Sequence, residues 1–589
     1  MKKKLILCIL LVFGAIAIGD EPADNVYWNG GTGLWMDGAN WTDDPALPDW
    51  SIPGYVGVEG YDWNKGVAVI TSGTAQITSG SAPDGRVEKL VIGGTGGASV
   101  DISGNVEFNR VLTANEGDQT GTINQTGGNV TIRNGGGLST FGVNGSSSYN
   151  LSGGSLTLSN NGIFGGSAGA TSQFNQTGGS FLANDTAQHF YVGNAAGSSG
   201  QFDIEGGNFT ISSKELYLGT SGSGTMNVSG NANVSLSTNA NQFYIAKNAG
   251  SSGSLNVQGG TVNINSTGPN GAIIGYSGNG TVNQTGGTLN ITAPRLYIGW
   301  NTSSSMNFNN GTINVSGGTQ YPSYAVIGRG TANNTSTLNM SGGTLNVTTA
   351  DAIGMTLGYY GNGTTYQELN KGIVNLSGGT MNINAALNIG WSGIGQFNLS
   401  GSGTLNASRV EMSYNHNSLS SALQAIQGSS LTISGGAFDA DTYLRSSSQL
   451  DVITILGSEA SKIEMSRMEM VAGSKLAIKL DEDGSTLIQV TGSDTNPYNG
   501  AMLAGISLEV DTLLGFDGQT GDRYNVLWSA TTIDDTGLSF VNLSSTPFIY
   551  QIVNAADYGY TSGQLMQLVV PEPVTITLLS IGLLLVRRR

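Results

Sequence analysis

The chain has 589 residues and a formal net charge of −17, with 91 glycines, 12 prolines and only 11% charged residues. Glycine does not recur at every third position, which excludes collagen, and the acidic balance argues against nucleic acid or anionic lipid as a partner. Apolar residues alternate with polar ones along most of the chain, which indicates one-sided β-strands rather than disorder. Cys8 is the only cysteine, so the sequence predicts neither disulfides nor a cysteine metal site.

The N-terminal segment 1–19 has the pattern of a secretory signal peptide. Three lysines at positions 2–4 precede an apolar run, and the small residues Ala17 and Gly19 follow near its end. The apolar run is short for a permanent transmembrane anchor. We therefore expect export of the chain and removal of this segment.

Residues 20–65 form a segment that is rich in tryptophan, glycine and turn-forming residues. Trp28, Trp35 and Trp41 allow two interpretations: they stack on sugar rings, or they cover the open apolar end of a repeat array. Terminal repeats of solenoids need such covering. We favour an N-terminal cap and keep carbohydrate stacking by these three tryptophans as the alternative.

A unit of two strand-like pieces joined by Gly-Gly recurs within residues 66–445. One copy is the sequence LNMSGGTLNV at Leu338–Val347. From Gly127 to Gly286 the equivalent glycine returns every 24 to 29 residues. Such a period is typical of solenoids, whereas a propeller blade needs about 40 to 50 residues. The sequence therefore predicts a stacked repeat array over this region.

Each unit also contains a third strand-like piece, of which LYLG at Leu216–Gly219 is an example. Apolar residues at i and i+2 in all three pieces share one face. Three short strands per repeat predict an all-β fold, a right-handed parallel β-helix with three strands per coil. The connection after the third piece varies most in length, up to Tyr359–Gly372. Insertions on one side of a solenoid often mark its binding side.

One polar position before the Gly-Gly turn is almost always asparagine. Identical amides one coil apart can hydrogen-bond as a ladder, as stacked asparagines do in cross-β assemblies. Many of these positions are also Asn-X-Ser/Thr sequons, which makes glycosylation an alternative, but the sequons share the structural period. The column consists of Asn124, Asn150, Asn175, Asn227, Asn256, Asn283, Asn307, Asn339, Asn375 and Asn398.

Two pairs of carboxylates are candidates for polysaccharide cleavage, a reaction that several β-helix proteins perform with clustered carboxylates. Asp203 and Glu205 lie at i and i+2, but Asp203 occupies the asparagine column. Asp439 and Asp441 form a similar pair near the end of the array. We interpret both pairs as solvent-facing substitutions and predict no catalytic residue.

The remaining candidates for chemistry are few. His189 and His416 are the only histidines, and they lie far apart with no serine or cysteine nucleophile motif between them. The acidic stretch Asp481–Gly484 lacks the spacing of a calcium loop and is expected to be an exposed turn. We therefore expect no metal site and no cofactor.

The Gly-Gly unit disappears after residue 445, although residues 446–568 stay strand-like. We expect irregular coils and then a C-terminal β cap, which would blunt the exposed strand edges. Residues 569–589 differ again, because a Pro-Glu-Pro break precedes an apolar run and a basic end. The run is too short to cross the hydrocarbon core comfortably as a helix, and its basic end should stay cytoplasmic.

This tail resembles the PEP-CTERM sorting signal of exported bacterial proteins. The resemblance covers about the last 20 residues and implies that an exosortase, a membrane protease, handles the tail after a transient membrane association. It also implies a destination at the cell surface or in the exopolysaccharide matrix, with the membrane segment removed. The residues that carry the resemblance are Pro571, Glu572 and Pro573 and the basic cluster Arg587, Arg588 and Arg589.

The repeats resemble those of autotransporter passengers, although no translocating barrel is expected at the C-terminal end, so self-export is not implied. The sequence as a whole predicts an exported, non-enzymatic structural or adhesive protein of the bacterial cell surface or matrix. Its expected partners are polysaccharide or other surface components. A secreted polysaccharide lyase or glycosidase and a carbohydrate-binding surface module remain the alternatives.

Overall fold

The computed structural model describes most of the chain between residues 25 and 572. The predicted signal peptide with Cys8, most of the long insertion after Tyr359, His416, Pro573 and the terminal arginines lie outside the described residues. Within the described part, no helix is long and apolar enough to cross a membrane. The described ranges are 25–37, 40–42, 67–79, 87–114, 119–133, 139–159, 162–239, 241–317, 324–330, 334–350, 352–359, 370–414, 427–492, 500–514 and 516–572.

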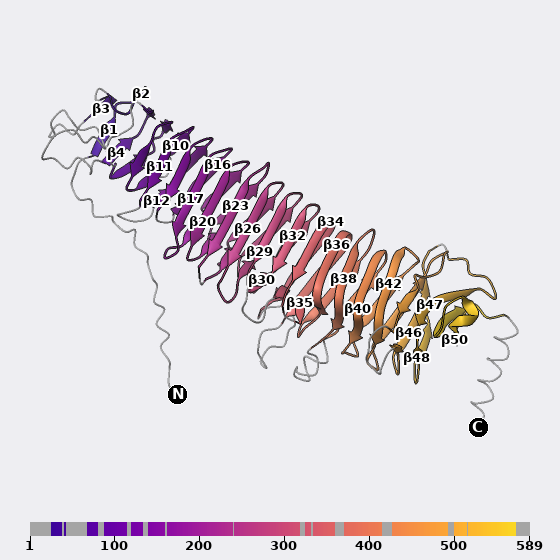
Figure 1. Ribbon diagram of the computed structural model, residues 1–589. Helices are drawn as coiled ribbons and strands as arrows, with labels where there is room; N and C mark the ends of the chain where they lie inside the picture. The colour runs from indigo at the N-terminus through magenta and orange to yellow at the C-terminus, as the bar shows by residue number, and fades with distance from the viewer. Residues whose placement is uncertain are drawn as a thin grey trace, which may run out of the picture.

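The described strands coil into a long rod (Figure 1). Strand β10 (Thr120–Gln125) pairs in parallel with β13 (Ser146–Leu151), and β11 (Asn129–Ile132) pairs in the same way with β14 (Ser155–Leu158). Along the regular part of the rod, each strand thus pairs with the third strand after it, so three strands complete one coil. The predicted parallel β-helix with three strands per coil is confirmed, and its right-handed coiling stays an expectation from the rule for parallel connections.

The rod has three parallel stacks of strands, named sheets 1, 2 and 3. Sheet 1, which precedes the Gly-Gly turn, contains β2 (Thr32–Leu34), β5 (Gly73–Ile77), β7 (Ala98–Ile102), β10, β13, β16 (Thr171–Gln176), β19 (Ser199–Ile204), β22 (Ser223–Val228), β25 (Ser252–Val257), β28 (Asn279–Gln284), β31 (Ser305–Phe308), β37 (Ile394–Leu399), β39 (Ser430–Ile433), β41 (Val452–Leu456), β43 (Lys475–Leu480), β46 (Ser507–Thr512) and β49 (Ser539–Asn542).

Sheet 2 follows the Gly-Gly turn. It contains β8 (Val106–Phe108), β11, β14, β17 (Ser180–Asp185), β20 (Asn208–Ser213), β23 (Asn233–Thr238), β26 (Thr261–Ser266), β29 (Thr288–Thr292), β32 (Thr312–Ser316), β44 (Ile488–Val490) and β47 (Arg523–Ser529). Five longer strands run through more than one sheet: β34 (Thr335–Thr348), β36 (Lys371–Ile389), β38 (Thr404–Met412), β40 (Gly436–Ser446) and β42 (Ala460–Glu469).

Sheet 3 completes the coil and is built from the LYLG-type pieces. It contains β1 (Asn25–Trp28), β4 (Val67–Ile70), β6 (Lys89–Ile92), β9 (Val111–Thr113), β12 (Ser139–Phe141), β15 (Gly162–Phe164), β18 (Phe190–Val192), β21 (Leu216–Leu218), β24 (Phe243–Ile245), β27 (Ala272–Ile274), β30 (Arg295–Ile298), β33 (Tyr324–Arg329), β35 (Ile353–Tyr359), β45 (Gly500–Met502) and β48 (Thr532–Asp534).

The Gly-Gly turn lets successive coils approach closely between sheets 1 and 2. The second glycine of the pair is left-handed, as at Gly154 with a φ of +77°. A Cβ at Gly154 would lie 2.2 Å from the carbonyl oxygen of Gly128 in the preceding coil. Both the backbone conformation and this contact therefore require glycine.

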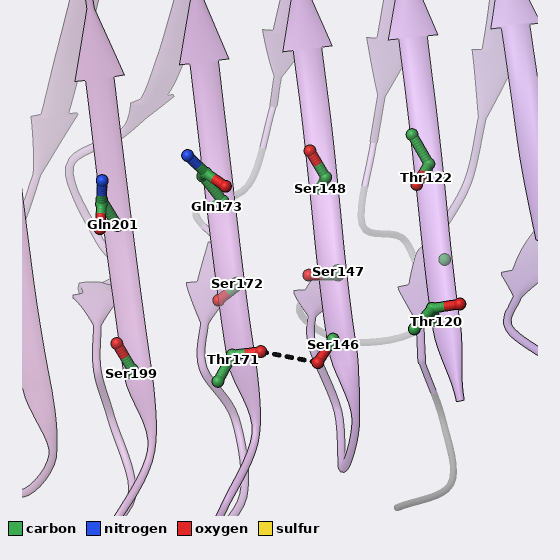
Figure 2. A pocket seen from close by; sticks show the side chains of 11 residues that line it. Thr120, Thr122, Ser146, Ser147, Ser148, Thr171, Ser172, Gln173, Ser199 and Gln201 are labelled. Atoms are coloured by element: carbon green, nitrogen blue, oxygen red, sulfur yellow. Dashed lines mark hydrogen bonds between the residues drawn. The ribbon is translucent and has the colours of Figure 1, made fainter. Parts of the chain in front are cut away.

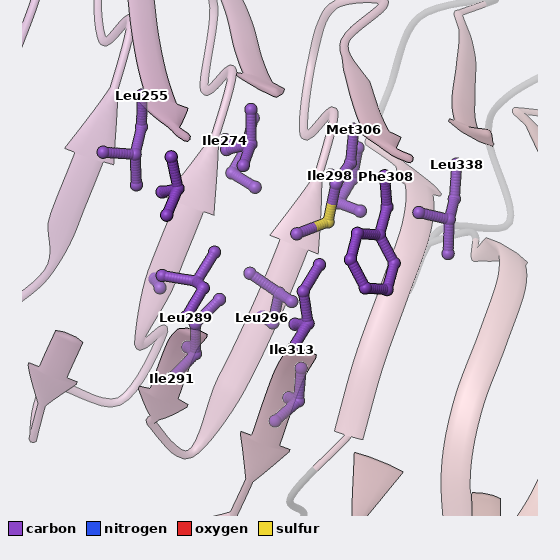
Figure 3. Close-up of a cluster of buried hydrophobic side chains, with 14 of the residues drawn as sticks. Leu255, Ile274, Leu289, Ile291, Leu296, Ile298, Met306, Phe308, Ile313 and Leu338 are labelled. Atoms are coloured by element: carbon purple, nitrogen blue, oxygen red, sulfur yellow. The ribbon is translucent and has the colours of Figure 1, made fainter. Parts of the chain in front are cut away.

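One continuous apolar core fills the rod, because the alternate residues of each strand point inward. Figure 3 shows part of it, where Leu289, Ile291 and Leu296 from neighbouring strands pack toward Met306 and Phe308. Further toward the N-terminus the core is aromatic. Phe174 is fully buried there, and its ring centroid lies 5.0 Å from that of Phe181 and 5.5 Å from that of Phe202.

The two ends of the rod depart from the regular coil. At the N-terminal end β3 (Trp41–Thr42) pairs antiparallel with β1, while β1 and β2 pair in parallel with β4 and β5. At the C-terminal end β51 (Gln564–Val569) lies antiparallel to both β47 and β50 (Ile549–Asn554), and the short 3-10 helix η3 (Ala555–Tyr558) follows β50. Antiparallel pairing occupies strand edges that the last coils would otherwise expose.

Candidate ligand-binding surface

The three N-terminal tryptophans lie inside the first coils. Trp28, Trp35 and Trp41 are only 4%, 0% and 7% exposed. Their rings pack edge to face, with centroids 5.0 Å apart for Trp28 and Trp41 and 4.8 Å apart for Trp35 and Trp41. Sugar stacking needs an open ring face, so this geometry favours the cap interpretation over the carbohydrate site.

The asparagine column of sheet 1 forms the predicted ladder. In each bond the side-chain Nδ2 donates to the Oδ1 of the equivalent residue one coil nearer the N-terminus, and the donor–acceptor distances are 2.6 to 2.9 Å. Each interior amide both donates and accepts within the column. These donors and acceptors are thereby satisfied by identical neighbours.

Asp203 begins the second of two ladder segments. Its carboxylate accepts hydrogen bonds from Asn227 one coil later and from Gln173 and Gln201. An ionised carboxylate has no hydrogen to donate to Asn175, so the ladder is interrupted between these two coils. Asp101 stands at the start of the first segment in the same way, where it accepts from Asn124. This arrangement gives Asp203 a structural role, and Glu205 lies exposed in the turn that follows.

A second amide ladder, which the sequence analysis did not single out, follows the outer face of sheet 2. Its side chains are linked by hydrogen bonds of 2.8 to 2.9 Å between successive coils and comprise Asn263, Asn290, Asn314, Asn346, Asn382 and Asn406. Over the coils that they span, the two ladders line the outer faces of sheets 1 and 2 with neutral amides.

The other acidic candidates also have structural partners. Asp439 follows Asn406 in register, and its carboxylate lies 2.7 Å from the Nζ of Lys462. Asp441 is exposed, and Asp481 accepts the backbone N–H groups of Ser458 and Asp483 within a tight turn. In the part of the chain that the structure describes, no three His, Cys, Asp or Glu side chains are arranged to hold a metal ion.

Shallow grooves run across the polar face of sheet 1. Figure 2 shows one of about 360 Å³, lined by hydroxyl and amide side chains of β10, β13, β16 and β19. A second groove of about 570 Å³ lies over the ladder at Asn283, Asn307, Asn339 and Asn375. Both grooves offer neutral hydrogen-bonding groups but no charged ones.

The outer face of sheet 3 differs, because it carries an aromatic column. Tyr191 and Tyr217 stack at 5.2 Å between ring centroids, and Tyr217 and Tyr244 stack at 5.4 Å. Tyr297 occupies the same column further along and is fully buried although it points away from the core. The middle residue of the LYLG-type piece is the sequence signal for this column, and the sequence analysis missed it.

Beside the column lies a second line of side chains, named the turn row, from the residues directly after the left-handed turn that ends each LYLG-type piece. Two cations of the turn row fold over the aromatic column. Lys247 Nζ lies 4.5 Å from the ring centroid of Tyr217, and Arg329 Cζ lies 3.6 Å from that of Trp300 and 4.7 Å from that of Tyr297. From residue 247 onward the turn row comprises Lys247, Tyr276, Trp300, Arg329, Tyr359, Trp391 and Tyr414.

His189 belongs to a polar network at the N-terminal part of this face. Its Nδ1 lies 3.1 Å from Glu215 Oε2, the Tyr217 hydroxyl donates to the same carboxylate, and Lys247 donates to the Tyr217 oxygen at 3.0 Å. Burial raises the pKa of Tyr217, and its hydrogen bond to Glu215 adds to the rise. The phenol therefore stays protonated at neutral pH, which suits a structural network rather than a general base.

Toward the C-terminus the column of sheet 3 becomes polar. Thr356, Asn388 and Glu411 occupy it in successive coils and are 0%, 1% and 2% exposed. Glu411 Oε1 accepts from Arg409 Nε at 2.8 Å and from the Tyr443 hydroxyl at 2.5 Å. The turn-row rings of Tyr359, Trp391 and Tyr414 lie in these same coils.

Comparisons with known proteins do not identify a family for this chain. No family model matches the chain, and neither a curated protein nor a solved structure matches it.

Proposed function

We propose that the protein is an exported, non-enzymatic rod of the bacterial cell surface or exopolysaccharide matrix, with a structural or adhesive role. The observation that carries the proposal is the contrast along the rod. Two faces are lined by amides that bond to one another, while the third presents aromatic and charged side chains over many successive coils. Such a surface suits repeated contact with a long polymer or with other surface components.

The two ends of the sequence support the destination. The first 19 residues read as an export signal, and the tail resembles a PEP-CTERM signal that an exosortase-type protease would process. The last described strand, β51, ends at Val569, and the motif residues Pro571 and Glu572 follow directly after it. A processing site directly after a folded rod would release the rod intact.

Cell fractionation tests this proposal. The full chain and a version lacking residues 570–589 are expressed in a bacterium that has an exosortase, and each is followed in membrane, surface, matrix and medium fractions. We expect the full chain in the surface or matrix fraction and the shortened chain elsewhere. A full chain that associates with neither cells nor extracellular polymer would contradict the proposed function.

A polysaccharide lyase or glycosidase is the weaker candidate. Asp203 is bonded to a ladder amide and Asp439 to a lysine, and the second carboxylate of each pair, Glu205 or Asp441, is exposed. Release of reducing or unsaturated ends from a polysaccharide panel, lost on substitution of Asp203, would favour the enzyme instead.

A further inference from the structure

The rings on the outer side of sheet 3 differ in how they are covered. Arg329 lies over Trp300, and its Cζ also lies 5.6 Å from the ring centroid of Tyr359. Outside the turn row, Arg445 and Arg467 lie over Tyr443, with distances from Cζ to the ring centroid of 5.7 and 5.0 Å. Between these two positions, among the described residues, no cation lies over Trp391 or Tyr414. Tyr414 is 46% exposed, so this stretch of the row keeps ring surface open to solvent.

The rings in this stretch form a connected surface that crosses three successive coils. The ring centroids of Tyr359 and Trp391 are 6.1 Å apart, and those of Trp391 and Tyr414 are 4.7 Å apart. Successive coils lie about 4.8 Å apart along the rod. A ligand that repeats along its length can therefore make equivalent contacts with Trp391 and Tyr414 and reach Tyr359 at the edge of the patch.

The polar column in the same three coils has unused hydrogen-bonding capacity. Thr356 Oγ1, both polar side-chain atoms of Asn388 and Glu411 Oε2 are buried, and none of them has a hydrogen-bond partner in the described protein. Buried polar atoms are paired in most proteins. Three successive coils with unpaired donors and acceptors thus indicate that something outside the described residues supplies the missing partners.

We propose that Trp391 and Tyr414, with Tyr359 at the edge of their patch and with the polar column of Thr356, Asn388 and Glu411, bind an extended neutral polysaccharide whose axis follows the rod. This proposal rests on the proposed function at the cell surface or in the matrix and names the polymer class that the rod would contact. Sugars present apolar C–H faces that pack on aromatic rings and hydroxyl groups that both donate and accept. That combination matches open rings beside a column that holds an amide N–H donor as well as oxygen acceptors.

Other ligand classes fit this surface less well. An acidic polymer would meet a chain of net charge −17 and the unpaired oxygen of Glu411. A metal ion would find the amide N–H of Asn388 among its neighbours, and that group cannot act as a ligand. The polar atoms of Thr356, Asn388 and Glu411 are closed off from solvent. The hydroxyl groups of a sugar can therefore reach these atoms only when the side chains that cover them shift. Binding should therefore be accompanied by a local rearrangement.

Affinity electrophoresis of the full chain tests the proposal with hydroxyethylcellulose and xylan as neutral probes and alginate as the acidic probe. We expect Trp391→Ala to weaken the binding of a neutral polymer about tenfold, as truncation of an aromatic anchor commonly does. Trp528→Ala is the matched control, because Trp528 is a partly exposed tryptophan in the C-terminal cap that stacks on Tyr560 at 5.4 Å. This control should bind as the unaltered chain does.

A second variant separates binding from folding. Asn388→Leu keeps a similar shape and removes the unpaired polar atoms, so the melting temperature should stay equal or rise while neutral-polymer binding falls. Unchanged binding in both Trp391→Ala and Asn388→Leu, or Trp391-dependent binding of alginate alone, would overturn the proposal. A full chain that binds neither hydroxyethylcellulose nor xylan would overturn the proposal too. In each case the proposed function stands if the rod still fractionates with the cell surface or matrix.

Discussion

The outward residues of sheets 1 and 2 differ from those of sheet 3, although all three sheets belong to the same coil. On sheets 1 and 2, Asn256 and Asn290 each lie within a column of identical amides that satisfy one another. On sheet 3 the outward residue changes from coil to coil, from Tyr217 to Ile273 to Asn388. Where the residue repeats, its hydrogen bonds are made along the column. Where it varies, turn-row side chains such as Trp300 and Tyr359 pack over it, and these side chains are only partly buried.

The apolar core is common to all three faces and should dominate stability. Phe174→Ala removes a fully buried ring from the aromatic part of the core, which should lower the free energy of unfolding by about 3–5 kcal/mol. Urea unfolding followed by circular dichroism measures the change. Leu182→Ala is the control, because Leu182 lies on the neighbouring strand β17 but is 37% exposed. Equal shifts for the two variants would contradict the described core.

The ladders should contribute less than the core but more than isolated surface contacts. Asn256→Ala removes one hydrogen bond given to Asn227 and one accepted from Asn283. At about 0.5–1.5 kcal/mol for each bond, we expect a loss of about 1–3 kcal/mol in the free energy of unfolding. Urea unfolding of the chain with and without the substitution measures this loss.

Asp203→Asn tests the same ladder at the point where it is interrupted. The new amide can donate to Asn175 and join the two ladder segments. The bonds that Oδ2 accepts from Gln173 and Gln201 are lost, but Gln201 keeps its bond to Oδ1. The two changes should nearly cancel, so stability should move by less than about 1 kcal/mol. A loss as large as that of Asn256→Ala would show that the carboxylate has a role beyond the start of a ladder.

The sequence was sufficient for those features that every coil repeats. Alternation fixes which residues face the core, and the recurrence of asparagine at one position predicts the ladder through Asn339 and Asn375. Left-handed glycines such as Gly154 explain the Gly-Gly turn. These predictions succeed because each depends on a local pattern and on neighbours that are the same pattern one coil away.

The face of sheet 3 could not be predicted in the same way. Tyr217 has tyrosines on both sides in its column, but Tyr297 stands between Ile273 and Val326, so the residue type does not repeat along the whole column. Their burial depends on Lys247 and Arg329 folding back after a left-handed turn, a tertiary contact that no spacing reveals. The length variation of the connection at Tyr359–Gly372 did indicate this side of the rod, but it named no residue.

The cationic cover of sheet 3 should have a moderate effect. Arg329→Met keeps the aliphatic length but removes the charge over Trp300, and should lower the free energy of unfolding by about 0.5–2 kcal/mol. Thermal unfolding measures the change. Lys214→Met, which removes an exposed cation four coils nearer the N-terminus, serves as the control. An equal effect of both variants would mean that general charge, and not the ring contact, matters.

The smallest expected effect is a pH dependence that the amide ladders do not share. Burial lowers the pKa of His189, although nearby Glu215 acts in the opposite direction. Above the usual value of about 6.5 the imidazole is neutral in both folded and unfolded chains. As the pH falls below that value, the unfolded chain takes up the proton first, so the folded chain loses stability. His189→Gln should therefore flatten the fall in melting temperature between about pH 6.5 and 5. Asn256→Ala should lower the melting temperature by a similar amount at both ends of this range, since an amide does not titrate there.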